Sequence, residues 1–347
     1  MKGNNIMRAN VLTDFQQMEL MQLPVPNATK NCAVIKMRYA GVCGSDVTVF
    51  SGKHPTATVP VVIGHEILGT IAALSEEGTA AGFRVGDRVT VNPLISCGSC
   101  GACRSGFSHV CRNLKLLGIH ENGGYAEYTC ASVDKLVKIP DSLCDETAAL
   151  AEPFAVGAHV TARAGVQPGD KVLVIGGGPI GIVVALCAAH LGADVTISEP
   201  NKKRRELAQG LGIRCLDPVS QDLAAVTAEL TGEGFDVVCE ASGSRPGILA
   251  ATDVCRVRGT IVPMSLSGEP AAFCLGKVSF KELSVVGSRV YTPEHFRMGV
   301  RMLSEIDRKI NLRSLVSDIL PLEEARQAIQ MMLDGSNAGK ILIRCEA

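Results

Sequence analysis

Two patterns of hydrophobic and polar positions divide the chain into two parts. Up to about residue 155, short apolar runs rich in β-branched residues alternate with Gly, Pro and Asp. Three of these runs are CAVIKMRYAGV (32–42), ILGTIAAL (67–74) and DRVTVNP (87–93). Many short strands separated by turn residues are typical of a β-barrel or a β-sandwich. We therefore predict a β-rich first domain.

From Gly165 the pattern changes to alternating strands and helices. The stretch DKVLVIGGGPIGIVVALCAAHLGADVTISEP (170–200) predicts a strand, a glycine turn, an apolar helix and a second strand. Further on, RPGILAATDVCRV (245–257) predicts a helix, and RGTIVPMS (258–265) and ELSVVGSRV (282–290) predict strands. This alternation indicates a doubly wound parallel sheet, so the predicted class is α/β. The tail EARQAIQMMLDGSNAGKILIRC predicts one more helix and a last strand that can return to the first domain.

The composition narrows the classes of function. The 347 residues are 46% hydrophobic and 20% charged with a net charge of -1, which fits a protein with a core and favours neither nucleic acid nor an anionic membrane as a partner. No apolar run reaches the roughly 18 uncharged residues of a membrane helix. The N-terminal MKGNNIMRANVL lacks the apolar stretch of a signal peptide. We expect a cytoplasmic protein.

Four of the 14 cysteines lie in CGSCGACRSGFSHVC (97–111), with the spacing C-x2-C-x2-C-x7-C. Adjacent C-x2-C pairs form strained disulfides, whereas four thiolates on one loop can form the closed tetrahedral shell of a structural zinc ion. An iron–sulfur cluster also uses four thiolates, although the bacterial ferredoxin run ends in C-x3-C-P. A redox or regulatory thiol group is the third alternative. We predict zinc, without chemistry of its own, at Cys97, Cys100, Cys103 and Cys111.

A glycine motif opens the predicted parallel sheet. G-x-G-x-x-G lies between an apolar strand and an apolar helix, the context in which this motif binds a dinucleotide pyrophosphate. Glu199 ends the second strand, where a carboxylate binds ribose hydroxyls and repels the 2′-phosphate of NADP. We expect NAD, and the basic run KKRR (202–205) keeps NADP as the less favoured alternative. The predicted cofactor residues are Gly176, Gly178, Pro179, Ile180, Gly181, Glu199 and Arg204.

A second set of candidate ligands is spread over the first domain. Cys43 lies in AGVCGSD, His65 and Glu66 in VVIGHEILG, and Glu152 in ALAEPFAVGAH. Any one of these residues alone is more often a core or surface residue. Their common setting, turns flanked by glycine or proline, favours a shared site. Three such protein ligands and one open position make a catalytic zinc site.

Taken together, these motifs resemble the zinc-dependent medium-chain dehydrogenase/reductase family over essentially the whole chain. CGSD, GHE, the four-cysteine lobe, GGYAEY, AEPFAVGAH and GGGPIG occur in the family's order. The resemblance implies a GroES-like catalytic domain at 1–155, with a structural-zinc lobe at about 93–115. It also implies a Rossmann NAD-binding domain at 156–288 and a return of 289–347 to the catalytic domain.

The glutamates resemble the branch of sorbitol, threonine and sugar-acid (L-galactonate-type) dehydrogenases, because alcohol dehydrogenases carry a second cysteine at the position of Glu152. In that branch Cys43, His65 and a glutamate hold the catalytic zinc. Glu66 and Glu152 both remain candidates for that glutamate.

The resemblance also implies supporting roles near this zinc. Asp46 would orient the ligand histidine, as such sites require. Ser45 fits the family's proton-relay hydroxyl. Many relatives have a histidine where this chain has Thr48, and His54 either takes the outer end of the relay or caps a loop.

The substrate is the least constrained feature. VVGSRVYTPEHF (285–296) resembles a segment of sugar-alcohol and hexonate dehydrogenases. Arg289 aligns there with a substrate-facing arginine of sorbitol-dehydrogenase relatives, and a surface arginine is its alternative. We expect oxidation of a secondary hydroxyl of a small-molecule polyol or aldonate by NAD+.

Other functions remain open. L-threonine and other secondary alcohols are alternative substrates. A non-catalytic cofactor-binding or regulatory protein is the alternative of another class, and a zinc-free quinone reductase is opposed by both metal groups. Relatives are homodimers or homotetramers built through the Rossmann domain, for which GTIVPMSLSGEP (259–270) is a candidate contact.

Overall fold

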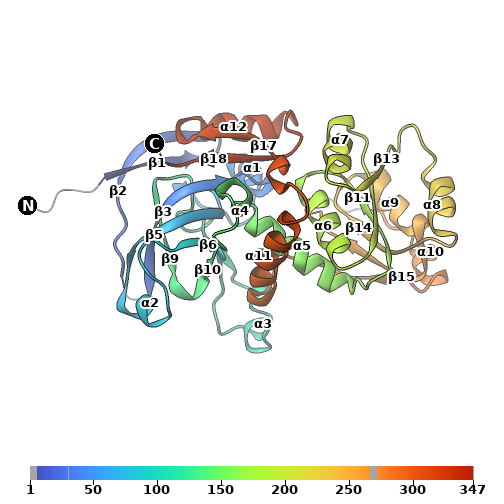
Figure 1. The fold of residues 1–347 in the computed structure, drawn as a ribbon, viewed down its shortest axis with the longest axis horizontal. Helices are drawn as coiled ribbons and strands as arrows, with labels where there is room; N and C mark the ends of the chain where they lie inside the picture. The colour runs from blue at the N-terminus through green and yellow to red at the C-terminus, as the bar shows by residue number, and fades with distance from the viewer. Residues whose placement is uncertain (1–5, 30, 266–271, 347) are drawn as a thin grey trace, which may run out of the picture. The chain divides into compact units, whose positions relative to one another are not determined.

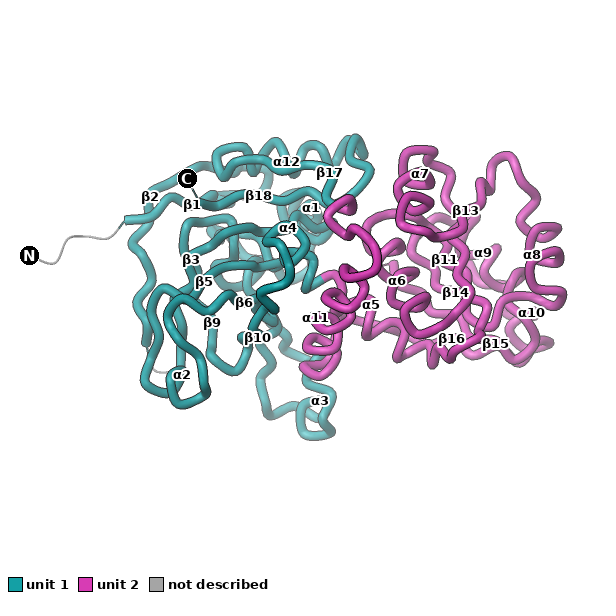
Figure 2. The backbone as a smooth tube through the Cα atoms, in the orientation of Figure 1, with its two compact units in different colours: residues 1–152, 316–347 teal, residues 153–315 magenta. Residues whose placement is uncertain are grey.

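The structure is a computed structural model that describes residues 6–29, 31–265 and 272–346. The chain forms two compact units, Met1–Glu152 together with Val316–Ala347, and Pro153–Leu315 (Figure 2). The first unit is rich in strands and the second contains a parallel sheet between helices. The predicted combination of a GroES-like β-rich domain and a Rossmann domain is confirmed.

The first unit contains most of the strands. They are β1 (Ile6–Asp14), β2 (Gln17–Pro24), β3 (Cys32–Gly41), β4 (Val61–Val62), β5 (Glu66–Leu74), β6 (Arg88–Val91), β7 (Leu94–Ile95), β8 (Lys115–Leu116), β9 (Tyr128–Ser132), β10 (Leu136–Lys138), β17 (Val316–Pro321) and β18 (Lys340–Arg344). Its helices are α1 (Gly44–Phe50), α2 (Glu76–Ala80), α3 (Gly101–Arg104), α4 (Asp145–Ala148) and α12 (Ala325–Leu333). Helix α5 (Ala151–Ala164) begins in this unit with its first two residues and continues in the second unit.

The C-terminal strands complete the main sheet of this unit. Its order is β10-β6-β5-β3-β18-β17, with β9 also paired to β3, while β2-β1-β4 form a smaller sheet. β18 pairs antiparallel with β3, in the register Leu342↔Gly41. Figure 1 shows the red strands β17 and β18 beside the blue N-terminal strands. The predicted last strand therefore lies in the same sheet as the strand that leads to Cys43.

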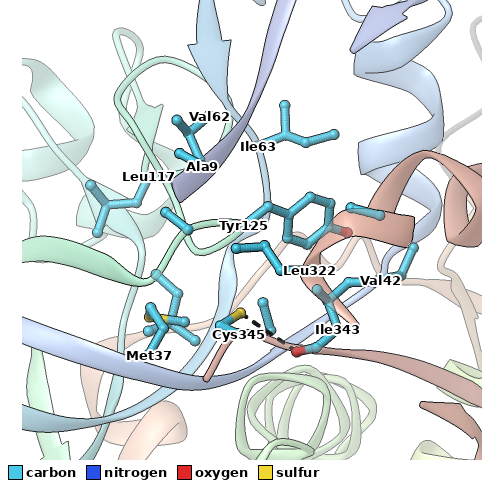
Figure 3. Close-up of a cluster of buried hydrophobic side chains, with 14 of the residues drawn as sticks. Ala9, Met37, Val42, Val62, Ile63, Leu117, Tyr125, Leu322, Ile343 and Cys345 are labelled. Carbon is cyan, nitrogen blue, oxygen red and sulfur yellow. Dashed lines mark hydrogen bonds between the residues drawn. The ribbon is translucent and has the colours of Figure 1, made fainter. Parts of the chain in front are cut away.

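The core of the first unit joins distant parts of the sequence (Figure 3). Tyr125 is fully buried and lies among side chains from β1, from the segment before β5 and from the C-terminal strand. Burying large apolar side chains of this kind stabilises a fold by about 1.5–3 kcal/mol each. Labelled members of this cluster are Ala9, Met37, Val42, Val62, Ile63, Leu117, Leu322, Ile343 and Cys345.

The second unit has a six-stranded parallel sheet. Its strands are β11 (Lys171–Ile175), β12 (Asp194–Ser198), β13 (Arg214–Leu216), β14 (Phe235–Glu240), β15 (Cys255–Pro263) and β16 (Ser284–Val285). Their order in the sheet is β13-β12-β11-β14-β15-β16. From β11 the chain adds β12 and β13 on one side and then β14, β15 and β16 on the other, so the strand order reverses next to β11. The helices are α6 (Pro179–His190), α7 (Lys202–Gly210), α8 (Leu223–Thr231), α9 (Arg245–Val254), α10 (Leu275–Phe280) and α11 (Pro293–Asp307).

Two predicted element boundaries in this unit were wrong. The helix expected to reach residue 257 ends at Val254, and the next strand begins at Cys255. Pairing of Cys255 with Phe235 on β14 overrides the helical pattern there. The strand expected over 282–290 is reduced to β16, an edge strand whose two residues pair only with β15 in the described part of the sheet.

The second unit also includes α11, which was expected in the segment 289–347 that returns to the first domain. Gly299 on α11 packs directly against the backbone of Ala155 on α5, so that no side chain fits between the two helices. Residues 266–270 of the candidate subunit contact lie outside the described residues. Within the described chain, no helix combines the length and the apolar character needed to cross a bilayer.

Candidate metal and cofactor sites

Three candidate ligands from two separate segments meet in the first unit. Cys43 caps the N-terminus of α1, His65 directly precedes β5, and Glu66 is the first residue of β5. One potential ligand atom of each lies within 4.8 Å of the others. His65 and Glu66 are buried and Cys43 is half-buried. A thiolate, an imidazole and a carboxylate are donors that zinc binds in proteins.

Asp46 is completely buried and orients His65. Its Oδ1 lies 3.1 Å from Nδ1 of His65, and its Oδ2 accepts from the Tyr125 hydroxyl at 3.1 Å and from the Cys43 N–H at 2.9 Å. The Asp46 carboxylate accepts the Nδ1 proton of His65, so Nε2 is the ring nitrogen left for an ion, and the ion would displace any proton there. Burial lowers the pKa of His65, but the charge and hydrogen bond of Asp46 outweigh it and hold that pKa well above its usual value.

The third candidate ligand, Glu66, has one carboxylate oxygen in an ion pair and one without a hydrogen-bond partner among the described residues. Its Oε1 pairs with the ammonium of Lys340 on β18. Its Oε2 is buried and has no hydrogen-bond partner among the described residues. An unsatisfied buried acceptor costs about 1–3 kcal/mol. The residues therefore fit a divalent ion, which would satisfy Oε2 together with the Cys43 sulfur and the His65 nitrogen.

Glu152 lies near this group but is not one of the three clustered ligands. It is the second residue of α5, it is buried, and its charge contributes to the raised pKa of Lys340. Burial has the largest effect on the pKa of Lys340 and lowers it, and the charge of Glu66 is the largest contribution that raises it. Glu66 is thus the carboxylate that the structure groups with Cys43 and His65.

The candidate relay residues have different surroundings. The Ser45 hydroxyl lies 3.4 Å from Nε2 of His65, beside the candidate ligand atoms. Thr48 donates to the Gly44 carbonyl at 3.0 Å within its own helix. Nδ1 of His54 accepts from the Thr56 N–H at 3.3 Å, as a loop cap does. Ser45 is thus the candidate relay residue that lies against the candidate ligand group.

Sequence reasoning missed Lys340 and Tyr125 as members of this site. Lys340 is 4% exposed, at the start of the apolar strand KILIR. A lysine at the head of an otherwise buried strand was a signal that could have been followed. Tyr125 gave no such signal, because a tyrosine in a core is ordinary and its bond to Asp46 spans 79 positions.

The four lobe cysteines also converge. All four sulfurs lie within 4.8 Å of one another, with Cys100 at 3.5 Å from Cys103 and 3.9 Å from Cys111. Four sulfurs at about 2.3 Å from one zinc ion lie about 3.8 Å apart in a tetrahedron. Backbone N–H groups of Ser99 and Cys100 lower the pKa of Cys97 to about 6. The lobe therefore fits a closed four-thiolate site, held at its base by β7 paired with β8.

The glycine motif of the second unit forms the turn between β11 and α6. Gly176 has φ +105°, which favours glycine, and its N–H donates to the Ser198 carbonyl at 2.8 Å. Gly181 packs against the Gly176 carbonyl, where a side chain would overlap it. Gly178 caps α6, with Pro179 and Ile180 as the first helical residues. This helix N-terminus offers N–H groups to a pyrophosphate.

Glu199 and Arg204 border this turn. Glu199 is buried, and its two oxygens accept from the N–H groups of Gly177 at 2.6 Å and Asn201 at 2.7 Å. A carboxylate has further lone pairs, so both bonds leave capacity for ribose hydroxyls. Arg204 on α7 places Nη1 4.0 Å from where a Cβ on Gly178 would lie. Arg289, by contrast, is exposed after β16 in this unit.

Two family models match the chain. The model described as "Alcohol dehydrogenase GroES-like domain" matches residues 29–141, within the first unit. The model described as "Zinc-binding dehydrogenase" matches residues 179–305, within the second.

Similar proteins extend over nearly the whole chain. It is 36% identical to 2-dehydro-3-deoxy-L-galactonate 5-dehydrogenase of Pseudoalteromonas atlantica, covering 89% of this chain and 90% of that protein. It is 34% identical to L-threonine 3-dehydrogenase of Escherichia coli K12, covering 93% and 95%.

Solved structures give the same picture. A protein of Escherichia coli CFT073, described as a short chain alcohol dehydrogenase complexed with NADH, matches with TM-score 0.88 and 29% identity over 98% of this chain and 99% of that one. L-idonate 5-dehydrogenase of Escherichia coli matches with TM-score 0.88 and 25% identity over 98% of each chain.

Proposed function

Since this chain belongs to the zinc-dependent medium-chain dehydrogenase/reductase family and is thus a zinc-dependent NAD(P) dehydrogenase, we propose that it oxidises a secondary hydroxyl of a sugar acid or polyol with NAD+. The observation that carries the proposal is the buried group of Cys43, His65 and Glu66, with the unpartnered carboxylate oxygen in it. Two similar proteins are named as 5-dehydrogenases of hexonic acids, which supports this substrate class. L-threonine is the alternative, because similarity to L-threonine 3-dehydrogenase is almost as high.

Each residue of the group has a chemical task in this reaction. Cys43, His65 and Glu66 would hold the catalytic zinc, with Glu152 nearby, and Asp46 fixes the His65 ring. When bound, zinc would supply Lewis acidity to the substrate hydroxyl, and NAD+ would supply the hydride acceptor. Ser45 carries the proton away from that hydroxyl. The four lobe cysteines would hold a second, structural zinc.

Ser45→Ala should lower kcat by about a hundredfold or more, with little change in KM, because the proton then lacks a positioned acceptor. Steady-state rates of NADH formation measure this. Ser45→Thr keeps the hydroxyl and should restore most of the rate. Thr48→Ala is the matched control, because that hydroxyl bonds within its own helix. A near-normal rate for Ser45→Ala would exclude Ser45 from the relay.

We propose NAD as the cofactor, bound by the glycine turn with Glu199 on the ribose hydroxyls. Glu199→Ala should reduce the ratio of NADPH to NADH dissociation constants by about tenfold or more, because the variant loses charged hydrogen bonds and the repulsion of the 2′-phosphate. Fluorescence titration with both cofactors measures the ratio without any substrate. Glu206→Ala, on the exposed side of α7, is the matched control. An unchanged ratio in Glu199→Ala would contradict this role, and Arg204 would then favour NADP.

NADH absorbance with purified protein, NAD+ and a substrate panel tests the proposed reaction. The panel contains D- and L-hexonates, hexitols, pentitols, L-threonine and simple alcohols. Turnover of an open-chain hexonate or polyol, lost with a chelator and restored by zinc, supports the proposal. Turnover of L-threonine alone supports the alternative. Metal binding without turnover of any compound would place the substrate outside these classes.

The same panel tests Arg289 as a residue for the substrate carboxylate. Its guanidinium is exposed and able to bind a carboxylate with two parallel hydrogen bonds. Arg289→Ala should then raise KM for a hexonate and leave KM for the matching hexitol unchanged. Equal effects on both substrates would indicate a surface arginine without this role.

We further propose a cytoplasmic homodimer or homotetramer. Exposed apolar side chains gather near the edge of the parallel sheet, on β15, α10 and β16, and such patches mark protein contacts. They are Val257, Leu275, Phe280 and Val285. Sedimentation velocity measures the assembly, and a monomer at micromolar concentration would contradict it.

A further inference from the structure

A buried lysine bonds to one of the proposed metal ligands. Lys340 begins β18, is 4% exposed and pairs with Oε1 of Glu66, which is completely buried. A buried ammonium is costly unless it is paired, and this pair is made across 274 positions of the sequence. The proposed chemistry assigns no task to Lys340. Its position therefore calls for an explanation in terms of Glu66.

The sheet fixes the positions of both groups. β3 lies between β5 and β18, and Gly41 at its end is opposite Glu66 on one side and Leu342 on the other. A side chain at Gly41 would overlap Oε2 of Glu66. Oε2 of the carboxylate thus packs against Gly41, while Oε1 forms the ion pair with Lys340. Of the two Glu66 oxygens, Oε2 is the one without a hydrogen-bond partner among the residues described, and this carboxylate is grouped with Cys43 and His65.

We propose that Lys340 is a positioning residue of the metal site. By binding Oε1, it restricts Glu66 to a single oxygen, Oε2, as a metal ligand, and so keeps the fourth coordination position open for the substrate. The inference rests on the proposed role of Cys43, His65 and Glu66 as ligands of the catalytic zinc.

The charges around the ion lead to a definite expectation. Without the ammonium, both oxygens of Glu66 are free to bind the ion, and the site becomes more negative by one unit charge. Both changes favour a divalent cation, and bidentate carboxylates are ordinary metal ligands. Loss of Lys340 should therefore give a site that holds metal more tightly and has a higher coordination number. A lysine that merely neutralised a buried carboxylate would affect stability but not coordination.

Cobalt(II) makes the coordination number visible. We would load the wild type and Lys340→Met with Co2+ and subtract the spectrum of Cys43→Ser, which leaves the signal of the Cys43 site. Lys340→Met should lose visible absorption as the site changes from four to five ligands. It should also release Co2+ to a chelator about tenfold more slowly, or slower still. Lys340→Arg keeps a positive charge on Glu66 and should therefore release Co2+ no more slowly than the wild type.

Two controls connect the effect to Glu66. Lys115→Met removes an exposed ion pair with Glu121 and should change neither spectrum nor release. In a Glu66→Gln background, Lys340→Met should have no further effect on either quantity. If Lys340→Met does not fold, Lys340→Gln serves for the same comparison.

The outcomes separate the two proposals. An unchanged spectrum and release rate in Lys340→Met, or faster release, would overturn the role of Lys340 while leaving the metal site intact. Effects of equal size in the presence and absence of Glu66 would overturn it as well. If the wild type shows no cobalt signal that depends on Cys43, the proposed catalytic metal site fails, and the inference about Lys340 fails with it.

Discussion

Cys43→Ser should reduce the metal content from about two ions per chain to about one and lower kcat/KM by about a thousandfold or more. A serine hydroxyl stays protonated at neutral pH and is a poor zinc ligand. The ion would then keep only His65 and Glu66 of the three candidate ligands, which is too few to hold it. Lewis acidity at a substrate hydroxyl is worth several kcal/mol of the barrier, and each 1.36 kcal/mol is tenfold in rate. Elemental analysis and NADH formation measure the two quantities.

Cys144→Ser is the matched control for this loss. Cys144 is exposed, precedes α4 and donates to the Thr147 hydroxyl at 3.2 Å, a position in which serine is an ordinary helix cap. This variant should keep both ions and full turnover. If Cys43→Ser also kept both ions and its rate, the catalytic metal site would not be built on Cys43.

Cys103→Ser should remove the other ion and lower the melting temperature by about 10 °C. Structural zinc contributes binding free energy directly to folding, and about 3 kcal/mol shifts the transition by this amount in a domain of this size. Calorimetry with and without a chelator measures the effect. The wild type should respond to the chelator, and the variant should respond much less.

Ser105→Ala tests whether this effect is specific. Ser105 is exposed and follows α3 in the same lobe, and its loss should change the melting temperature little. A melting temperature unaffected by Cys103→Ser would contradict a stabilising ion in the lobe. Iron in place of zinc would favour the cluster that the cysteine spacing left open.

Local motifs predicted the fold well, because all the residues that define each motif lie within a short stretch of the sequence. The glycine turn after an apolar strand and the four cysteines within a single loop are of this kind. The boundary between α9 and β15 was missed, because it depends on pairing with a strand 20 residues earlier rather than on local pattern.

The metal group was predictable only in part. Cys43, His65 and Glu66 each lie in a short recognisable motif, and the structure brings them together. The bonds of Asp46 to Tyr125 and of Glu66 to Lys340 depend on how strands pair, over separations of 79 and 274 positions. The buried lysine could have been noticed in the sequence, but its partner could not, because strand order follows from the whole sheet.

The place of β18 in the sheet has a consequence for biosynthesis. The four lobe cysteines are complete once residue 111 has emerged from the ribosome, so their ion can bind to a short stretch of nascent chain. The group of Cys43, His65 and Glu66 gains Lys340, the ion-pair partner of Glu66, only when β18 (residues 340–344) has been made and has paired with β3. The lobe could therefore take up its proposed ion after about a third of the chain has been made, whereas the catalytic group is completed only with the C-terminal strand.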